Sequence, residues 1–145
     1  MVKAVSDDGQ RLVVLNEVYI GHPGHQTARY RIAGVERQAS SGVLVGTGTG
    51  STGWCRSVWQ ERGSRLALPA PAEPRLVWFV REAWPSPGTG VEHSEGSLTS
   101  EPLTIDVESD GLAVFGDGIE HDSVSLGWGQ QLSVGLSRTT LSLVS

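Results

Sequence analysis

Glycine and proline interrupt this chain so often that long helices have little room to form. The 145 residues include 19 glycines and 7 prolines, and both residue types are poorly tolerated inside helices. Short runs of the length that strands favour lie between them. Four runs alternate apolar and polar residues with a period of two, which predicts strands with one buried face. These runs are residues 28–32, 103–108, 132–136 and 140–144.

Two longer apolar runs and one turn signal add to the expected β structure. Residues 11–20, RLVVLNEVYI, predict one long strand. Residues 75–82, RLVWFVRE, are apolar on both faces, which is typical of a strand covered on both sides. The pair Asp110-Gly111 stands between two strand-like runs and predicts a hairpin turn.

One helix and one long loop complete the expected secondary structure. Residues 52–62 carry a helical pattern, with Ser51 or Thr52 as the N-cap and Gly63 as the end. Residues 86–102 are polar and rich in glycine and serine, which predicts a loop. We therefore expect a mainly β domain of packed sheets with one short helix.

The composition indicates one domain that folds in water. A chain of this length can bury one hydrophobic core, so residues 1–145 are expected to form a single domain. The net charge is −5 and the 11 Lys and Arg residues are scattered, which argues against a nucleic-acid partner. No run approaches the roughly 18 apolar residues of a membrane span, so no membrane association is expected. The prediction is a cytoplasmic protein, or a mitochondrial one in a eukaryote.

The most distinctive stretch is GVLVGTGTGSTGWCRS, where an apolar run leads into closely spaced glycines. Three glycines satisfy the G-x-G-x-x-G pattern between a predicted strand and a predicted helix: Gly48, Gly50 and Gly53. Bare backbone N–H groups at such a helix start can bind the phosphates of a dinucleotide. The hydroxyl groups interleaved with the glycines suit a phosphorylated or polyhydroxylated ligand. They belong to Thr47, Thr49, Ser51 and Thr52. The alternative is a tight turn in which glycine only relieves crowding.

A second anomaly is the polar pair inside residues 11–20. With a period of two, Asn16 points to the same face as Val18, so its amide is directed toward a buried region and needs hydrogen-bond partners. Glu17 points to the other face, beside Tyr19. Either the pair binds the hydroxyl groups of a sugar, or it lies in a solvated bulge or strand end.

Together these segments resemble the C-terminal, nucleotide-binding domain of NAD kinases. The resemblance rests on VLNEVYIG, residues 14–21, followed about 20 residues later by SSGVLVGTGTGSTGWCRS, residues 40–57. The common family pattern has Asp-Gly before the glycines and Ala-Tyr after them. Here Ser41-Gly42 and Gly53-Trp54 occupy these places, which resembles the divergent mitochondrial type. The segments RLVWFVREAW and VFGDGIEHD extend the resemblance over nearly the whole chain.

The resemblance implies a role in making NADP, because the family transfers the γ-phosphoryl group of ATP to the adenosine 2'-hydroxyl of NAD. It implies that Asn16 and Glu17 hold the adenosine side of NAD, and that Trp54 lies against the nucleotide. The residues implied to line the adenine and phosphate region are Thr49, Gly50, Ser51 and Thr52. The remaining implied contacts are Ser57, which helps to hold a base, and the turn at Asp117 and Gly118.

One part of the family pattern has no counterpart in these 145 residues. The Gly-Gly-Asp-Gly-Thr motif, which carries the base and the loop for the ATP phosphates, belongs to an N-terminal α/β domain. Phosphoryl transfer depends on positioning and charge neutralisation by such groups. We therefore expect no catalytic residue here and no activity of this chain alone. ATP and Mg²⁺ are implied for the complete enzyme, and a homodimer or higher homo-oligomer is the implied state.

Two other functions stay open. The chain could be a non-catalytic nucleotide-binding or oligomerisation module. It could also be a fragment of a Rossmann-type oxidoreductase, with residues 42–82 as a βαβ unit and Glu82 as the ribose-binding acid. The histidines of HPGH, His22 and His25, have a spacing compatible with a metal, but we expect a Pro-Gly turn and no metal site.

Overall fold

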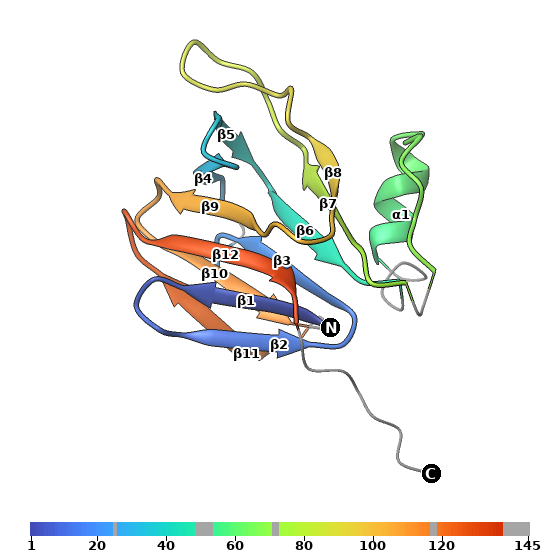
Figure 1. The fold of residues 1–145 in the computed structure, drawn as a ribbon. Helices are drawn as coiled ribbons and strands as arrows, with labels where there is room; N and C mark the ends of the chain where they lie inside the picture. Colours follow the sequence, from blue (N-terminus) through green and yellow to red (C-terminus); the bar gives the residue numbers. More distant parts are fainter. Residues whose placement is uncertain (25, 49–53, 71–72, 117–118, 138–145) are drawn as a thin grey trace.

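The computed structural model describes residues 1–24, 26–48, 54–70, 73–116 and 119–137, and their strands form two six-stranded antiparallel sheets (Figure 1). Sheet A contains β1 (Val2–Ser6), β2 (Arg11–Val14), β4 (Ala28–Ile32), β5 (Glu36–Ser40), β9 (Leu103–Val107) and β12 (Gln131–Leu136). Sheet B contains β3 (Glu17–Gly21), β6 (Gly42–Gly46), β7 (Leu76–Arg81), β8 (Glu95–Leu98), β10 (Leu112–Gly116) and β11 (Ile119–Leu126). The strand orders are β2-β1-β12-β9-β4-β5 and β11-β10-β3-β6-β7-β8.

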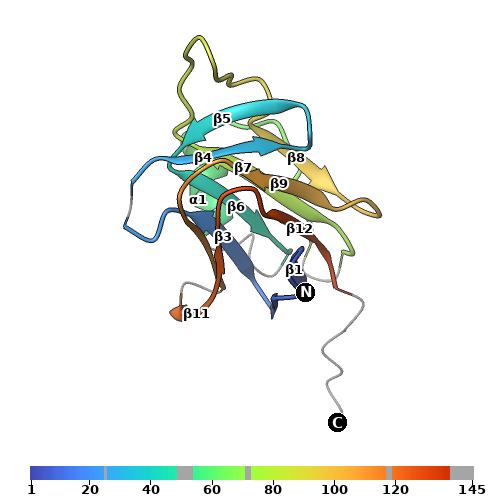
Figure 2. The ribbon, with the colours of Figure 1, turned by 90° about the vertical axis from the view of Figure 1, so that its left-hand side faces the viewer.

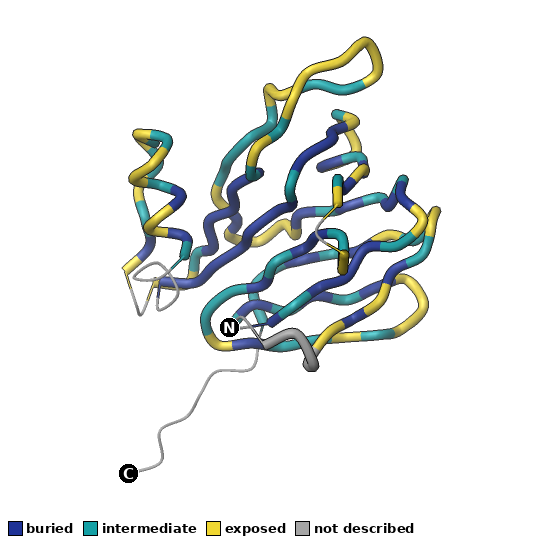
Figure 3. Tube along the Cα trace, turned by 180° about the vertical axis from the view of Figure 1, so that it is seen from behind, coloured by how far each residue is buried: buried dark blue, intermediate teal, exposed yellow. Residues whose placement is uncertain are grey.

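The two sheets pack face to face around one hydrophobic core (Figure 2). Alternate residues of β4 and β9 are buried, as the period-two pattern predicts for strands that cover a core on one face. Buried residues run along the strands, and exposed ones gather at the turns (Figure 3). The expected mainly β domain of packed sheets with one short helix is confirmed, and residues 28–32, 103–108 and 132–136 contain strands as predicted.

The helix α1 (Trp54–Glu61) covers the outer face of sheet B at strands β6 and β7. Its buried residues Cys55 and Val58 pack on Leu44 of β6 and on Val77 and Phe79 of β7. The opposite faces of the same two strands point into the core between the sheets. Strand β7 is therefore covered on both sides, which confirms the prediction for residues 75–82.

The helix ends where the sequence predicts. Gly63 has a φ of +59°, in the left-handed region that glycine adopts without steric cost. The N–H of Ser64 donates to the carbonyl of Trp59 at 3.1 Å, which satisfies one of the last carbonyls of the helix. The predicted caps Ser51 and Thr52 lie outside the described residues.

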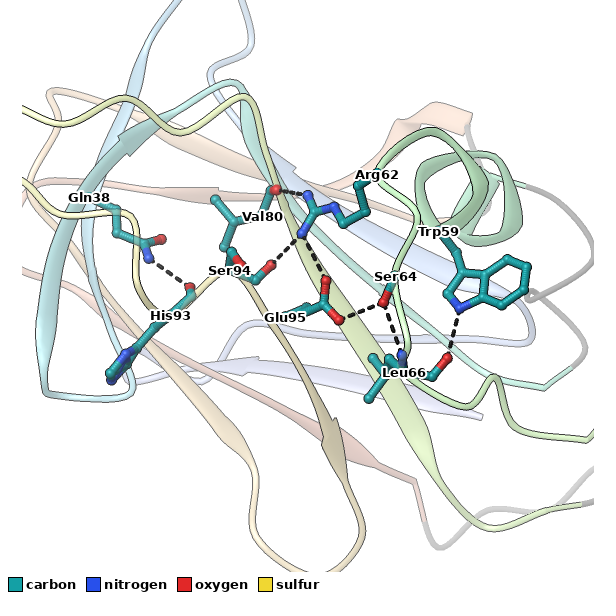
Figure 4. A network of polar contacts seen from close by, with 9 residues as sticks. All are labelled: Gln38, Trp59, Arg62, Ser64, Leu66, Val80, His93, Ser94 and Glu95. Atoms are coloured by element: carbon teal, nitrogen blue, oxygen red, sulfur yellow. Dashed lines mark hydrogen bonds and ion pairs between the residues drawn. The ribbon is translucent and has the colours of Figure 1, made fainter.

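A polar network fastens the end of α1 to the hairpin of β7 and β8 (Figure 4). Arg62 donates to the carbonyls of Val80 and Ser94 and forms an ion pair with Glu95 at 3.4 Å. Ser64 donates to the same carboxylate at 2.5 Å. The position of the helix is thus determined by hydrogen bonds as well as by apolar contacts.

Residues 11–20 form two strands, so the prediction of one long strand is wrong. Strand β2 belongs to sheet A and β3 to sheet B, and the chain crosses between the sheets at Leu15 and Asn16. The apolar pattern continues through this point because both strands face the same core. A pattern of burial alone does not reveal that the chain changes sheets.

The predicted hairpin at Asp110-Gly111 is also wrong. Strand β9 pairs with β12 and β4 in sheet A, whereas β10 pairs with β11 and β3 in sheet B. The turn connects the two sheets, and neither of its residues has a positive φ. The loop predicted at residues 86–102 contains the strand β8, and residues 140–144 lie outside the described part of the chain.

Replacing Leu44 tests how much the second face of sheet B contributes to stability. Leu44 is 0% exposed beneath α1, and we expect Leu44→Ala to lower the free energy of unfolding by about 2–5 kcal/mol. Chemical denaturation measures this change. The control Val35→Ala alters a residue that is 61% exposed and should change stability by less than about 0.5 kcal/mol. Equal effects of the two variants would contradict the burial of this face.

Replacing Gly63 tests the end of the helix. Gly63→Ala places a side chain in the left-handed region, and we expect a loss of about 1–2 kcal/mol in the free energy of unfolding. The control is Gly88→Ala, because Gly88 lacks a positive φ and has no atoms near its missing Cβ. If Gly63→Ala has the same free energy of unfolding as the wild type, the helix does not end at this glycine.

Candidate functional site

The two segments that carry the family resemblance meet at one corner of sheet B. In the pairing of β3 with β6, Glu17 lies opposite Gly46. The backbone N–H of Thr47 donates to the carbonyl of Asn16 at 2.9 Å. We call these four residues, Asn16, Glu17, Gly46 and Thr47, the Asn16–Thr47 corner. Three of the predicted binding residues are thereby brought together from segments about 30 positions apart.

Thr47 also fixes the crossing between the sheets. Its hydroxyl group lies 2.9 Å from the carbonyl oxygen of Leu15 and 3.1 Å from that of Asn16, and it donates to this pair. Thr47 is only 8% exposed, so these bonds are shielded from water. The backbone on either side of the Asn16 side chain is therefore held in place by a residue of the glycine-rich segment.

Helix α1 approaches the corner closely because Gly46 has no side chain. A Cβ atom at Gly46 would lie 2.5 Å from the sulfur of Cys55, closer than real Cβ contacts. Cys55 is fully buried, and its thiol has its pKa raised to about 12. Burial is the largest cause, followed by the negative charge of Glu17 and a hydrogen bond with its side chain. The Cys55 thiol and the Glu17 carboxylate are thus neighbours.

Trp54, the first residue of α1, packs on the outer face of sheet B. Its ring centroid lies 4.9 Å from that of Tyr19, at an interplanar angle of 36°, and the guanidinium of Arg81 lies 5.0 Å from the Trp54 ring. Trp54 is partly buried by these contacts. These contacts constrain the orientation of the Trp54 ring. The contact of Trp54 with a nucleotide stays a prediction.

Two glycines make room for the Tyr19 ring. A Cβ at Gly42 would lie 2.4 Å from the Tyr19 hydroxyl oxygen, and one at Gly21 would lie 2.7 Å from a ring carbon. The hydroxyl group donates to the carbonyl of Ser41. Burial raises the pKa of Tyr19, so this group stays protonated as a donor. The ring joins β3 to the start of β6, two residues along β3 from Glu17.

The predicted site residues divide into three groups. Asn16, Glu17 and Thr47 form part of the corner, and Trp54 lies on the adjacent helix. Ser57 is exposed on α1, and no described contact links it to the corner. The others lie outside the described residues: Thr49, Gly50, Ser51, Thr52, Asp117 and Gly118.

The sequence did not predict that Cys55 and Tyr19 pack at this site. The glycines at positions 21, 42 and 46 are the only signal in the sequence, because each is required by the bulk of one of these two side chains. The identity of the bulky partner depends on how helix and strands pack, which no local pattern contains.

No metal site is found in the described ranges, where no three His, Cys, Asp or Glu side chains form a group able to hold an ion. His22 accepts a hydrogen bond from the N–H of Gly24 through Nδ1 at 2.9 Å, as expected for a turn, and His25 lies outside the described residues. Among the same residues, no helix has the length and apolar character needed to cross a membrane.

The Rossmann hypothesis is wrong because β6 and β7 are antiparallel. Gly42 pairs with Arg81, so Glu82 lies at the end of the sheet opposite to Gly46 and the glycine-rich segment. A ribose-binding acid would have to lie at the same end as the glycines. Glu82 instead accepts a hydrogen bond from Ser41 at 2.6 Å and lines a small hollow of about 160 Å³ beside α1.

Comparison with solved structures bears on the fold of the chain. No family model matches the chain, and no curated protein matches it. Among solved structures, the chain is similar to yeast NADH kinase complexed with NADH, with a TM-score of 0.67 and 18% sequence identity. The match covers 94% of this chain but 39% of the yeast chain. At this identity the likeness shows the fold, which is that of an NAD kinase-like β domain.

Replacing Thr47 tests whether it holds the corner together. Thr47→Val keeps the shape of the side chain and removes its hydroxyl group, so we expect a loss of about 1 kcal/mol in the free energy of unfolding. Amide hydrogen exchange should also become faster at Asn16 and Glu17. The control Thr99→Val alters an exposed threonine and should leave both measurements unchanged. Unchanged exchange in Thr47→Val would mean that the crossing does not depend on this hydroxyl group.

Proposed function

We propose that this chain is the nucleotide-binding part of an NAD kinase and that it binds NAD or NADP at the Asn16–Thr47 corner. One observation carries the proposal: the pairing of β3 with β6 joins Asn16 and Glu17 to Thr47, just before the glycine-rich segment and α1. These are the two segments that resemble NAD kinases. The fold likeness to an NADH kinase that was solved with NADH supports the same conclusion.

The chemistry of the corner suits the adenosine end of a dinucleotide. A carboxylate accepts hydrogen bonds from ribose hydroxyl groups, and an amide both donates and accepts them. We assign these roles to Glu17 and Asn16. Thr47 donates its hydroxyl proton to the backbone beside these two residues, and we propose that it holds them in place for the ligand. The glycine-rich residues that follow would supply backbone N–H groups for phosphate oxygens.

The proposed activity needs parts beyond these residues. The resemblance implies that the catalytic base and the loop for the ATP phosphates belong to a separate α/β domain. We therefore propose that this chain binds NAD but does not phosphorylate it alone, and that ATP and Mg²⁺ act in the complete enzyme. We further propose a homo-oligomer, and a mitochondrial-type NAD kinase on the basis of Ser41-Gly42 and Trp54.

Calorimetric titration with NAD, NADP and ATP tests the proposal. We expect the chain to bind NAD or NADP, and we expect Asn16→Ala or Glu17→Gln to weaken binding at least tenfold, about 1.4 kcal/mol. The control Gln131→Ala removes an exposed amide in sheet A and should bind as the wild type does.

Two outcomes would contradict the proposal. If neither NAD nor NADP binds, the corner is not a nucleotide site in this chain. If the nucleotide binds to Asn16→Ala and to Glu17→Gln as tightly as to the wild type, the binding residues lie elsewhere.

A chain that binds NAD but remains inactive when joined to a domain with the Gly-Gly-Asp-Gly-Thr motif would be a non-catalytic binding module.

A further inference from the structure

The sulfur of Cys55 lies above the point where β3 and β6 pair at the corner. Glu17 is opposite Gly46 in the register, and the missing Cβ of Gly46 provides the space that the sulfur fills. The side chain of Glu17 lies on this outer face of sheet B, because it shares the face of Tyr19 two residues further along β3. A residue of the helix therefore lies beside a proposed binding residue of the sheet.

We infer that Cys55 is a positioning residue, whose thiol donates a hydrogen bond to the Glu17 carboxylate and holds it in the orientation that binds a nucleotide hydroxyl group. The inference rests on the proposed function, because the orientation of Glu17 affects binding only if the nucleotide binds at the corner. It adds a residue that does not touch the ligand itself.

The chemistry of the contact favours a thiol that acts as a donor. The pKa of Cys55 is raised to about 12, so the group stays protonated at neutral pH and does not place a second negative charge beside Glu17. A buried thiol of this kind is also a poor nucleophile and a poor metal ligand. Its hydrogen bond to the carboxylate is the chemical role that remains.

The contact complements the action of Thr47. Thr47 fixes the backbone at Leu15 and Asn16, and its hydroxyl group bonds to these carbonyls and not to the Glu17 side chain. A glutamate side chain loses considerable rotamer freedom when it is ordered. If Cys55 orders it before the ligand arrives, less of that entropy is lost on binding. The helix thereby contributes to affinity through an intermediate residue.

A matched set of variants tests this inference. Cys55→Ala removes the donor, Cys55→Ser restores a donor of smaller size, and Val58→Ala removes volume from the same apolar cluster without touching Glu17. We expect Cys55→Ala to weaken NAD binding roughly fivefold. Cys55→Ser should recover most of this loss, and Val58→Ala should bind NAD as the wild type does even though it unfolds more easily.

A double-mutant cycle tests the contact without any ligand. Chemical denaturation is measured for Cys55→Ala, for Glu17→Ala and for the double variant. If the side chains interact, the shift in midpoint for the double variant differs from the sum of the single shifts. The corresponding cycle of Val58→Ala with Glu17→Ala should be additive.

Three results would overturn the inference. They are additive shifts in the Cys55 and Glu17 cycle, equal weakening of NAD binding by Cys55→Ala and Val58→Ala, and no recovery in Cys55→Ser. Failure of the wild-type chain to bind NAD would count against the proposed function instead. In that case the cycle would still decide whether the Cys55 thiol interacts with Glu17.

Discussion

Burial of strands β6 and β7 on both faces is the constraint on which the rest of the structure depends. One face of β6 and β7 packs against sheet A, and the other packs beneath α1. The helix can lie this close only because Gly46 leaves space for the Cys55 sulfur. The same close approach brings the helix to the Asn16–Thr47 corner. The stability of the sheet and the shape of the candidate site therefore have a common origin.

The sequence predicts those elements whose burial follows a local pattern. Strand β7 is apolar on both faces because both faces are covered, and Gly63 ends α1 because it adopts a left-handed conformation. Elements whose partners are distant in the chain are predicted poorly. The crossing at Leu15 and Asn16 is held by Thr47, which lies more than 30 residues away in the sequence. No residue next to the crossing therefore predicts it.

Strand β5 escaped prediction for a different physical reason. Its inward face carries Gln38 and Ser40, which are both almost fully buried and would normally indicate a solvated segment. Tyr30 donates to the Gln38 amide oxygen at 2.9 Å and lies 2.7 Å from the Ser40 hydroxyl oxygen, so the polar groups are satisfied inside the core. A hydrophobicity pattern does not recognise a strand that is buried through hydrogen bonds.

The topology of sheet A also determines when this domain can form during synthesis. Strand β12 lies between β1 and β9, so it joins the hairpin of β1 and β2 to the other strands of the sheet. A nascent chain that has not yet produced residues 131–136 therefore carries β1 with one edge unpaired. Non-local pairing of this kind forms slowly, and open strand edges favour aggregation. Sheet A is therefore complete only once residues 131–136 have paired with β1 and β9, and until then the edge of β1 is open to pairing with another chain.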